Sequence, residues 1–210
     1  NGQLGDGSVI NSDVPVYVSS SNKFLSVSSG GLHSCGVTSL GDAYCWGDNA
    51  FGQLGDGNTA DSGLPVYVSS GFKFLEVVAQ NDHSCGLRSN GEMYCWGDND
   101  YGQADVPNNL VNPINVTAGS AHTCAIDDNG VHCWGYNFYG QTDVPTDLVN
   151  PMVVSAGWDH SCAIDDNGVH CWGDNGSGQT DVPTDLVNPV AISAGNLHTC
   201  ALDDNGLHCW

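Results

Sequence analysis

Short apolar runs of four to six residues, separated by turn sequences every 8–12 residues, make up the hydrophobic pattern of the chain. Residues 189–193, 199–202 and 207–210 are examples, each bounded by Gly, Asn or Asp. Runs of this length and spacing are typical of β-strands joined by tight turns. No stretch repeats its apolar residues at helical spacing. The pattern therefore predicts an all-β protein.

The predicted strands fall into five copies of one unit, each opening on a variable residue followed by Gly-Gln and carrying Cys-Trp near its end. The units are residues 1–50, 51–100, 101–138, 139–176 and 177–210. The fourth and fifth match at 25 of 34 aligned positions, so the repetition is not accidental. We interpret residues 1–210 as a single repeat domain. The last unit stops four residues short of the 38-residue period and Asn1 continues in phase, so we expect either a segment of a longer tandem array or a unit whose two ends are complementary.

A hairpin in each unit places its two cysteines opposite each other. If Asp128 and Asn129 form the turn of the third unit, Ile126 faces Val131 and the two cysteines of that hairpin face each other. In the long units the cysteines are one residue further apart. A three-residue loop at 89–91, with its glycine at positive φ, restores the same alignment there.

Opposed strand residues have Cβ atoms about 4.5–5.5 Å apart, which is close to disulfide geometry. Each bond would close a loop of about ten residues and contribute roughly 2.5–3 kcal/mol. Such bonds persist in oxidising compartments, so we expect a secreted protein, outside the cell or on its surface. The five predicted pairs are Cys35–Cys45, Cys85–Cys95, Cys124–Cys133, Cys162–Cys171 and Cys200–Cys209.

The alternative for these residues is a two-Cys, two-His zinc site. In the third unit its ligands would be His122, Cys124, His132 and Cys133. Adjacent strand residues point to opposite faces, so His132 points away from the other three. The long units also carry Tyr44 and Tyr94 in its place. Disulfides are therefore favoured, and we expect no resident metal and no cofactor.

A longer string, Ala-Gly-x-x-His-Ser/Thr-Cys-Ala-Ile/Leu, then Asn-Gly, then Cys-Trp-Gly-x-Asn-x-x-Gly-Gln, resembles the repeat of the regulator of chromosome condensation family. Residues 119–141 are its clearest instance. The short units, with Gly-Gln-Thr-Asp-Val-Pro, are more similar to compact blades of the secreted β-lactamase-inhibitor propeller protein and its bacterial extracellular relatives. The resemblance implies a β-propeller or a propeller-type array with four-stranded antiparallel blades. Family members commonly have seven blades and five units are present here, so the chain could form an incomplete ring, a five-blade ring or an open array.

The charge balance restricts the possible partners. Asp and Glu number 24 against three Lys and Arg, a net charge of -21, and residues 101–210 hold 13 Asp and no cationic residue. Phosphate backbones are bound by clustered Lys and Arg, so we expect no nucleic-acid partner. No apolar run is long enough to cross a bilayer, so we expect no membrane insertion. The family's nucleotide-exchange role at chromatin is not expected of such an acidic chain.

Residues that recur in every unit are interpreted as structural. Five equivalent histidines, beginning with His33, imply a repeated hydrogen bond rather than one catalytic base. No nucleophile–base pair, phosphate loop or paired-carboxylate motif is present, so we expect no enzymatic activity. Function should concentrate on loop positions that differ between units. The candidate contact residues are the aromatics Phe51, Tyr101, Phe138, Tyr139 and Trp158, for which packing between blades is the alternative.

Two further kinds of site have weaker patterns. Paired Asp residues at the hairpin turns could bind Ca²⁺, although ordinary turn chemistry explains them as well. They are Asp127, Asp128, Asp165, Asp166, Asp203 and Asp204. Sequons at Asn115 and Asn175 are possible glycosylation sites.

Two functions fit these features. The first is a non-enzymatic extracellular structural or adhesive repeat protein whose copies assemble head to tail into an array or filament. The second is a closed propeller that binds a protein or glycan partner through the loop aromatics, as an inhibitor or lectin would.

Overall fold

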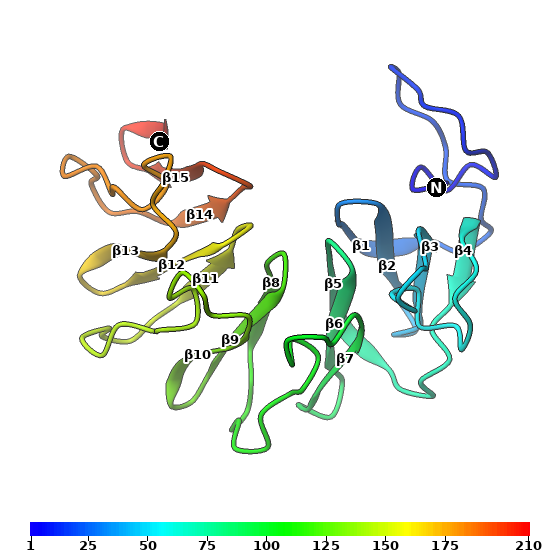
Figure 1. Cartoon of the computed structure of the whole chain (residues 1–210), viewed down its shortest axis with the longest axis horizontal. Coiled ribbons are helices and arrows are strands. Elements are labelled where there is room, and N and C mark those ends of the chain that lie inside the picture. Colours follow the sequence, from blue (N-terminus) through cyan, green and yellow to red (C-terminus); the bar gives the residue numbers. More distant parts are fainter. The chain divides into compact units, whose positions relative to one another are not determined.

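The computed structural model describes all 210 residues, and its regular structure consists of β-strands. The strands are β1 (Phe24–Ser29), β2 (His33–Thr38), β3 (Ala43–Gly47), β4 (Ser62–Tyr67), β5 (Phe74–Gln80), β6 (His83–Arg88), β7 (Met93–Gly97), β8 (Asn115–Ala118), β9 (His122–Asp127), β10 (Gly130–Gly135), β11 (Val153–Ala156), β12 (His160–Asp165), β13 (Gly168–Gly173), β14 (Ala191–Ala194), β15 (Thr199–Asp203) and β16 (Gly206–Cys209). They form five antiparallel sheets (Figure 1), so the all-β prediction is confirmed. The structure contains no helix with the length and apolar character that crossing a bilayer requires.

The chain divides into two compact units, residues 1–100 and 101–210. This boundary is also the one between the long and short sequence repeats. The first unit holds the sheets β1-β2-β3-β4 and β5-β6-β7. The second holds β8-β9-β10, β11-β12-β13 and β14-β15-β16. That residues 1–210 act as a single repeat domain stays a prediction.

The expected four-stranded blade is right for the first sheet and wrong for the other four, which have three strands. The fourth strand of the first sheet, β4, belongs to the second sequence repeat, where Val66 lies opposite Cys45. Sheets two, three and four are each followed by a short repeat, which lacks the segment that carries β4. The missing residues thus shorten the sheet that precedes them.

The hairpins have the predicted register. Ile126 faces Val131, Asp127 faces Gly130, and the turn consists of the two residues between them. In the long repeats Gly91 has φ 83° and its N–H donates to Arg88 O, which closes the predicted three-residue loop. Both loop lengths place the cysteines directly opposite each other.

All five predicted disulfides are formed, with Cα–Cα distances of 4.0–4.1 Å. No cysteine is free. Since every sulfur is bonded to another sulfur, the zinc alternative is wrong for these residues.

Buried histidines connect successive sheets. His122 Nε2 lies 2.9 Å from Ser161 Oγ, and this hydroxyl donates to the main-chain oxygen of Gln141 at 3.0 Å. Because the hydroxyl hydrogen is used on Gln141, Ser161 Oγ accepts from His122, whose proton therefore sits on Nε2. The predicted repeated hydrogen bond is confirmed at three of the five histidines. The chains are His33–Ser84–Gln53, His122–Ser161–Gln141 and His160–Thr199–Gln179.

The same glutamine holds the recurrent tryptophan. Trp172 Nε1 donates to Gln141 O at 3.0 Å, so this carbonyl accepts two hydrogen bonds from buried groups. The side chain of Gln141 is fully buried and accepts from the backbone of Tyr139. Trp46, Trp96 and Trp134 bond Gln3, Gln53 and Gln103 in the same way. The Gly-Gln segment is therefore hydrogen-bonded to the sheet that follows it, and we call this connection the Gly-Gln joint.

Four of the five recurrent histidines have a glycine three residues before them, and in residues 101–210 the histidine ring lies too close to that glycine for a side chain to fit. A Cβ on Gly157 would lie 2.3 Å from Cε1 of His160 and 2.5 Å from the backbone oxygen of Gly195. Real Cβ atoms do not come this close to ring or backbone atoms. The histidine ring thus occupies the space that a side chain at Gly157 would need.

We expect Gly157→Ala to lower the free energy of unfolding by roughly 2–3 kcal/mol, because the ring or the backbone must shift. Gly176→Ala is the matched control, since its nearest neighbour is a flexible Asp174 oxygen at 3.4 Å. Urea denaturation of both variants measures the difference. Equal stability of the two would show that the ring is not tightly packed.

Acid should destabilise the fold through the buried histidines. Burial lowers the pKa of His33, His83 and His160 from 6.5 to about 4. The unfolded chain therefore binds more protons between these values, and the stabilisation present above pH 6.5 is lost as pH falls toward 4. We expect a loss of roughly 2 kcal/mol per histidine between pH 7 and about pH 4.5. Urea denaturation in about 0.5 M salt, which screens carboxylate repulsion, measures it. If the free energy of unfolding did not change between pH 7 and about pH 4.5, the histidines would not be buried as neutral imidazoles.

Candidate binding surface

Four aromatic side chains of the second compact unit form one continuous group, here called the aromatic surface: Tyr101, Tyr136, Phe138 and Tyr139. The ring centroids of Tyr101 and Tyr136 are 4.7 Å apart, Phe138 lies 6.4 Å from Tyr136, and Tyr139 lies 5.1 Å from Phe138. Phe138 is 77% exposed, and Tyr101 and Tyr139 are about half exposed. The structure thus brings three of the predicted contact aromatics together through Tyr136.

Tyr136 was missed by the sequence reasoning, although its position carries a signal. The residue after Cys-Trp-Gly is Asp at 48, 98 and 174 and Tyr only at 136. Asp48 accepts a hydrogen bond from Gln53 Nε2 at 2.7 Å, and Asp174 accepts one from the equivalent glutamine. A tyrosine there removes this carboxylate and leaves the buried amide of Gln141 in need of another acceptor.

Asp159 supplies that acceptor. Its Oδ1 lies 3.1 Å from Gln141 Nε2 and 3.5 Å from Ser120 Oγ, both of which donate. Burial raises the pKa of Asp159, and the nearby Asp174 raises it further. Burial also raises the pKa of Tyr136, with smaller effects from the neighbouring tyrosines and Asp159. Tyr136 therefore stays neutral and keeps its hydroxyl hydrogen.

Trp158 lies in the loop between β11 and β12. It is 42% exposed, and its backbone is held at both ends: Trp158 N donates to Gly195 O, and Ser120 N donates to Trp158 O, each at 3.1 Å. The indole is therefore presented by a fixed loop. Phe51 belongs to the first compact unit, where it is 49% exposed. A role in partner binding stays a prediction for all five residues.

The hairpin Asp residues are engaged in turn chemistry. Asp127 accepts from the backbone N–H groups of Val111 and Asn129, each at 2.7 Å, and from His132 Nε2 at 3.0 Å. Burial opposes ionisation of Asp127, but these hydrogen bonds prevail and lower its pKa. Asp165 and Asp203 repeat the arrangement. No group of three or more His, Cys, Asp or Glu has the arrangement of a metal site.

The two sequons lie in different surroundings. Asn175 is on an exposed loop, where its Nδ2 donates to Asp181 Oδ1 at 2.8 Å. Asn115 is at the start of β8, half-buried, with a buried side-chain oxygen that has no hydrogen-bond partner. Of the two, Asn175 is the better placed to receive a glycan.

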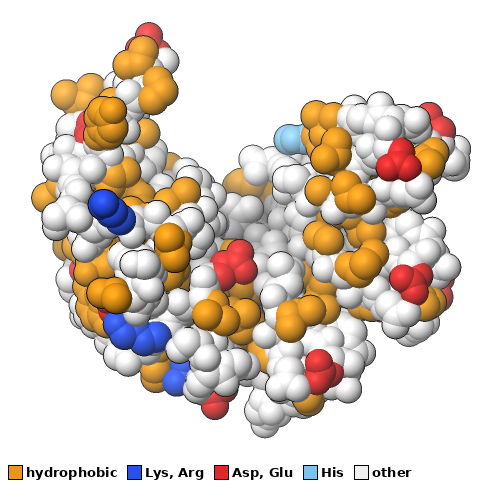
Figure 2. Space-filling view, turned by 180° about the vertical axis from the view of Figure 1, so that it is seen from behind, with side chains coloured by type: hydrophobic (Ala, Val, Ile, Leu, Met, Phe, Trp, Pro, Cys, Tyr) orange, Lys and Arg blue, Asp and Glu red, His pale blue; other side chains and the backbone are white.

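The two compact units differ in their charged residues. All three cationic side chains, Lys23, Lys73 and Arg88, belong to residues 1–100. On the face that Figure 2 shows, Lys and Arg side chains (dark blue) are sparse and Asp and Glu side chains (red) are scattered. Residues 101–210, which carry the aromatic surface, hold 13 Asp and no Lys or Arg. The aromatic surface is therefore part of a strongly acidic unit.

Comparison with known families agrees with this architecture. The regulator of chromosome condensation (RCC1) repeat matches residues 24–53, 77–103, 114–141 and 154–179, and a second form of it matches 1–37 and 41–87. The chain belongs to the RCC1 repeat family. No curated protein sequence matches the chain.

Several solved RCC1-like structures share the fold. Human WBSCR16 superposes with a TM-score of 0.81 at 19% identity, over 97% of this chain and 66% of its own. Prp20p from Saccharomyces cerevisiae gives 0.75 at 22% identity, over 89% and 57%. The CRINKLY WD40 ectodomain of the Arabidopsis thaliana receptor kinase ACR4 gives 0.70 at 27% identity, over 92% and 67%. The chain thus spans less than two thirds of the first two.

The five disulfides and the likeness to a receptor ectodomain favour an extracellular milieu for this RCC1-repeat protein.

Asp159 replaces, as acceptor for Gln141, the aspartate that other repeats carry at the position of Tyr136. A second substitution that restores this aspartate tests the replacement. Asp159→Ala should cost about 1–3 kcal/mol, because Gln141 Nε2 is left buried without its acceptor. Adding Tyr136→Asp should recover most of this loss, since Asp at that position bonds the equivalent glutamine at 48 and 174. Urea denaturation measures both variants. If the double variant is no more stable than Asp159→Ala, the two carboxylates are not interchangeable.

Proposed function

We propose that this chain is a non-enzymatic extracellular binding module, secreted or held at a cell surface, which engages a basic segment of a partner protein through the aromatic surface. The observation that carries the proposal is a group of four neighbouring, partly exposed aromatic rings in a unit with no cationic residue. Large exposed aromatic groups of this kind mark interaction sites on otherwise polar surfaces.

Two physical effects favour a basic partner. Lys and Arg side chains gain about 0.5–2 kcal/mol when they lie over an aromatic face. The 13 Asp of residues 101–210 create a negative field that attracts cations over a longer range and speeds association at low salt. Rigid rings also contribute contact area at a low cost in side-chain entropy.

The backbone around the rings is fixed before binding. Tyr139 N donates to the buried side chain of Gln141, and the loop that carries Trp158 is held by two backbone hydrogen bonds. A preorganised surface loses little conformational entropy when a partner binds. That the short repeats resemble blades of a secreted inhibitor propeller, and share such a binding role, stays a prediction.

Head-to-tail assembly into a structural or adhesive array stays a prediction. It would make the partner another copy of this chain, whereas the lack of cations in residues 101–210 favours a partner of opposite charge.

The double variant Phe138→Ala/Tyr139→Ala tests the proposal. Two immobilised probe sets are used: peptides of Lys and Arg with glycine spacers, which lack the alternating apolar residues of a β-strand, and neutral oligosaccharides. We expect the wild-type chain to bind the peptides and the double variant to bind them at least tenfold more weakly, which corresponds to about 1.4 kcal/mol. Tyr17→Ala is the matched control, since Tyr17 is 96% exposed and makes no ring contact with this group.

Equal peptide binding by the wild type and the double variant would refute the role of the aromatic surface. Binding of oligosaccharides in place of peptides, with the same sensitivity to the double substitution, would make the protein a glycan binder and overturn the basic-partner assignment.

A further inference from the structure

Four of the five sheets lack a fourth strand, and two of them, the third and the fourth, have a groove beside the edge strand. These sheets end at β10 and β13, whereas the first sheet continues from β3 to β4. An edge strand presents unpaired main-chain N–H and C=O groups, which can pair with another extended chain. The first sheet therefore shows which kind of segment can pair with the edges of β10 and β13.

The register identifies the groups at the open edge. Residues of an antiparallel pair alternate between hydrogen-bonded and non-hydrogen-bonded positions, and the latter have the shorter Cα–Cα distance, about 4.5 Å. Cys133 lies 4.1 Å from its partner cysteine on β9 and is therefore at a non-hydrogen-bonded position. Its main-chain groups, and by the alternation those of Val131, point away from β9 and toward the open side. Val169 and Cys171 hold the same places in β13.

The first sheet shows these groups in use. Ala43 and Cys45 of β3 correspond to Val131 and Cys133 of β10. Val68 N, just beyond β4, donates to Ala43 O at 3.0 Å, and Val66 of β4 lies opposite Cys45. An extended segment with valine at alternate positions thus satisfies the edge.

Burial of the third strand differs between the first sheet and the third and fourth sheets. Ala43, Cys45 and Trp46 are at most 3% exposed beneath β4. All six residues of β10 are half-buried, and five of the six residues of β13 are as well. Groups that β4 covers in the first sheet are therefore partly open to solvent in the third and fourth.

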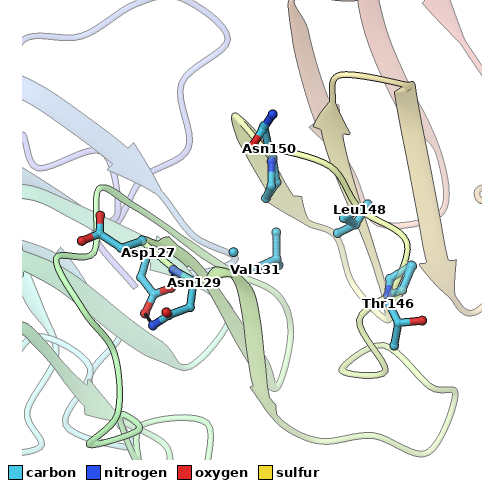
Figure 3. A pocket seen from close by; sticks show the side chains of 10 residues that line it. Asp127, Asn129, Val131, Thr146, Leu148 and Asn150 are labelled. Atoms are coloured by element: carbon cyan, nitrogen blue, oxygen red, sulfur yellow. Dashed lines mark hydrogen bonds between the residues drawn. The ribbon is translucent and has the colours of Figure 1, made fainter.

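A groove of about 510 Å³ lies beside β10 (Figure 3). Asp127 and Asn129 of the hairpin stand on one side, Leu148 and Thr146 of the following loop stand on the other, and Val131 projects between them. The groove recurs one 38-residue period later beside β13, as two adjoining cavities of about 380 and 360 Å³. Most of its lining is polar, and Val131 and Leu148 supply apolar contacts for valine side chains. The exposed Asp128 and Asp166 add negative charge at its rim.

We propose that the edges of β10 and β13 bind an extended segment of a partner protein by strand addition, and that this segment has alternating apolar residues flanked by Lys or Arg. The β4 segment Leu-Pro-Val-Tyr-Val shows the apolar pattern. The acidic rim and the absence of Lys and Arg from residues 101–210 select for flanking cations. The site uses main-chain groups for affinity and the groove for specificity. It rests on the strand edges and is separate from the aromatic surface.

The probe is a fluorescent, end-blocked peptide of sequence KLPVYVSK, titrated into the full chain and followed by anisotropy. We expect saturable binding by two equivalent sites. A peptide ELPVYVSE should bind at least tenfold more weakly at low salt, because its charges are repelled by the rim. A KLPVYVSK peptide that is N-methylated at both valines should not bind, since these residues correspond to Val66 and Val68, which face β3 in the first sheet.

Variants of the protein test the same edge. Val131→Pro/Val169→Pro removes two outward N–H groups, and proline is tolerated in edge strands where that side faces solvent. We expect at least a tenfold loss of peptide binding. Val131→Thr/Val169→Thr keeps both N–H groups and a β-branched shape and should bind as the wild type does. Melting temperature and free-thiol content report whether each variant folds, and the N-methylated peptide decides the question if the proline variant does not.

Equal binding of the N-methylated peptide, or full binding by a folded proline variant, would overturn strand addition. Phe138→Ala/Tyr139→Ala should bind the peptide normally, which separates this site from the aromatic surface. Residues 14–18, Val-Pro-Val-Tyr-Val, carry the β4 pattern in the chain itself. Self-association that the peptide inhibits and Val16→Lys abolishes would identify a second copy as the occupant and overturn the partner assignment.

Discussion

The hydrogen bond from a buried histidine to a hydroxyl of the next sheet is the interaction on which this architecture depends. An imidazole in a dry interior must have a partner, since an unmade hydrogen bond there costs about 1–3 kcal/mol. Ser161 supplies it for His122 and at the same time bonds Gln141, whose carbonyl also accepts from Trp172. The recurring Gly, His, hydroxyl, Gln and Trp are therefore one connected arrangement. Residues outside it are free to differ between repeats, and the aromatic surface consists of such residues.

Much of the sheet structure could be predicted because short-range rules determine it. The two residues of the turn after Asp127 set the register of β9 and β10, and the register sets the disulfide between Cys124 and Cys133. The number of strands per sheet could not be predicted in the same way. The repeat read from Gly-Gln to Cys-Trp assigned β4 to the second repeat, whereas it pairs with the first sheet.

Only part of the aromatic surface could be predicted from the sequence, because a contact between repeats determines the rest. Tyr101, Phe138 and Tyr139 could be selected because they vary in loops, but the residue that connects their rings, Tyr136, replaces an aspartate of the Gly-Gln joint. Its compensation by Asp159 joins residues of different sheets, and only the folded chain places them together. A departure from an otherwise regular joint is thus a useful indication of function in such repeats.

Each disulfide closes a hairpin within a single sheet, so no covalent bond other than the backbone links one sheet to the next. Duplication of one 38-residue stretch of the gene therefore adds a hairpin with its own complete set of cysteines and leaves the existing pairs unchanged. Under a mechanical load, neighbouring sheets can separate one after another while every disulfide bond stays intact. Repeats can therefore be added as whole units, and the sheets can separate without cleavage of a disulfide bond.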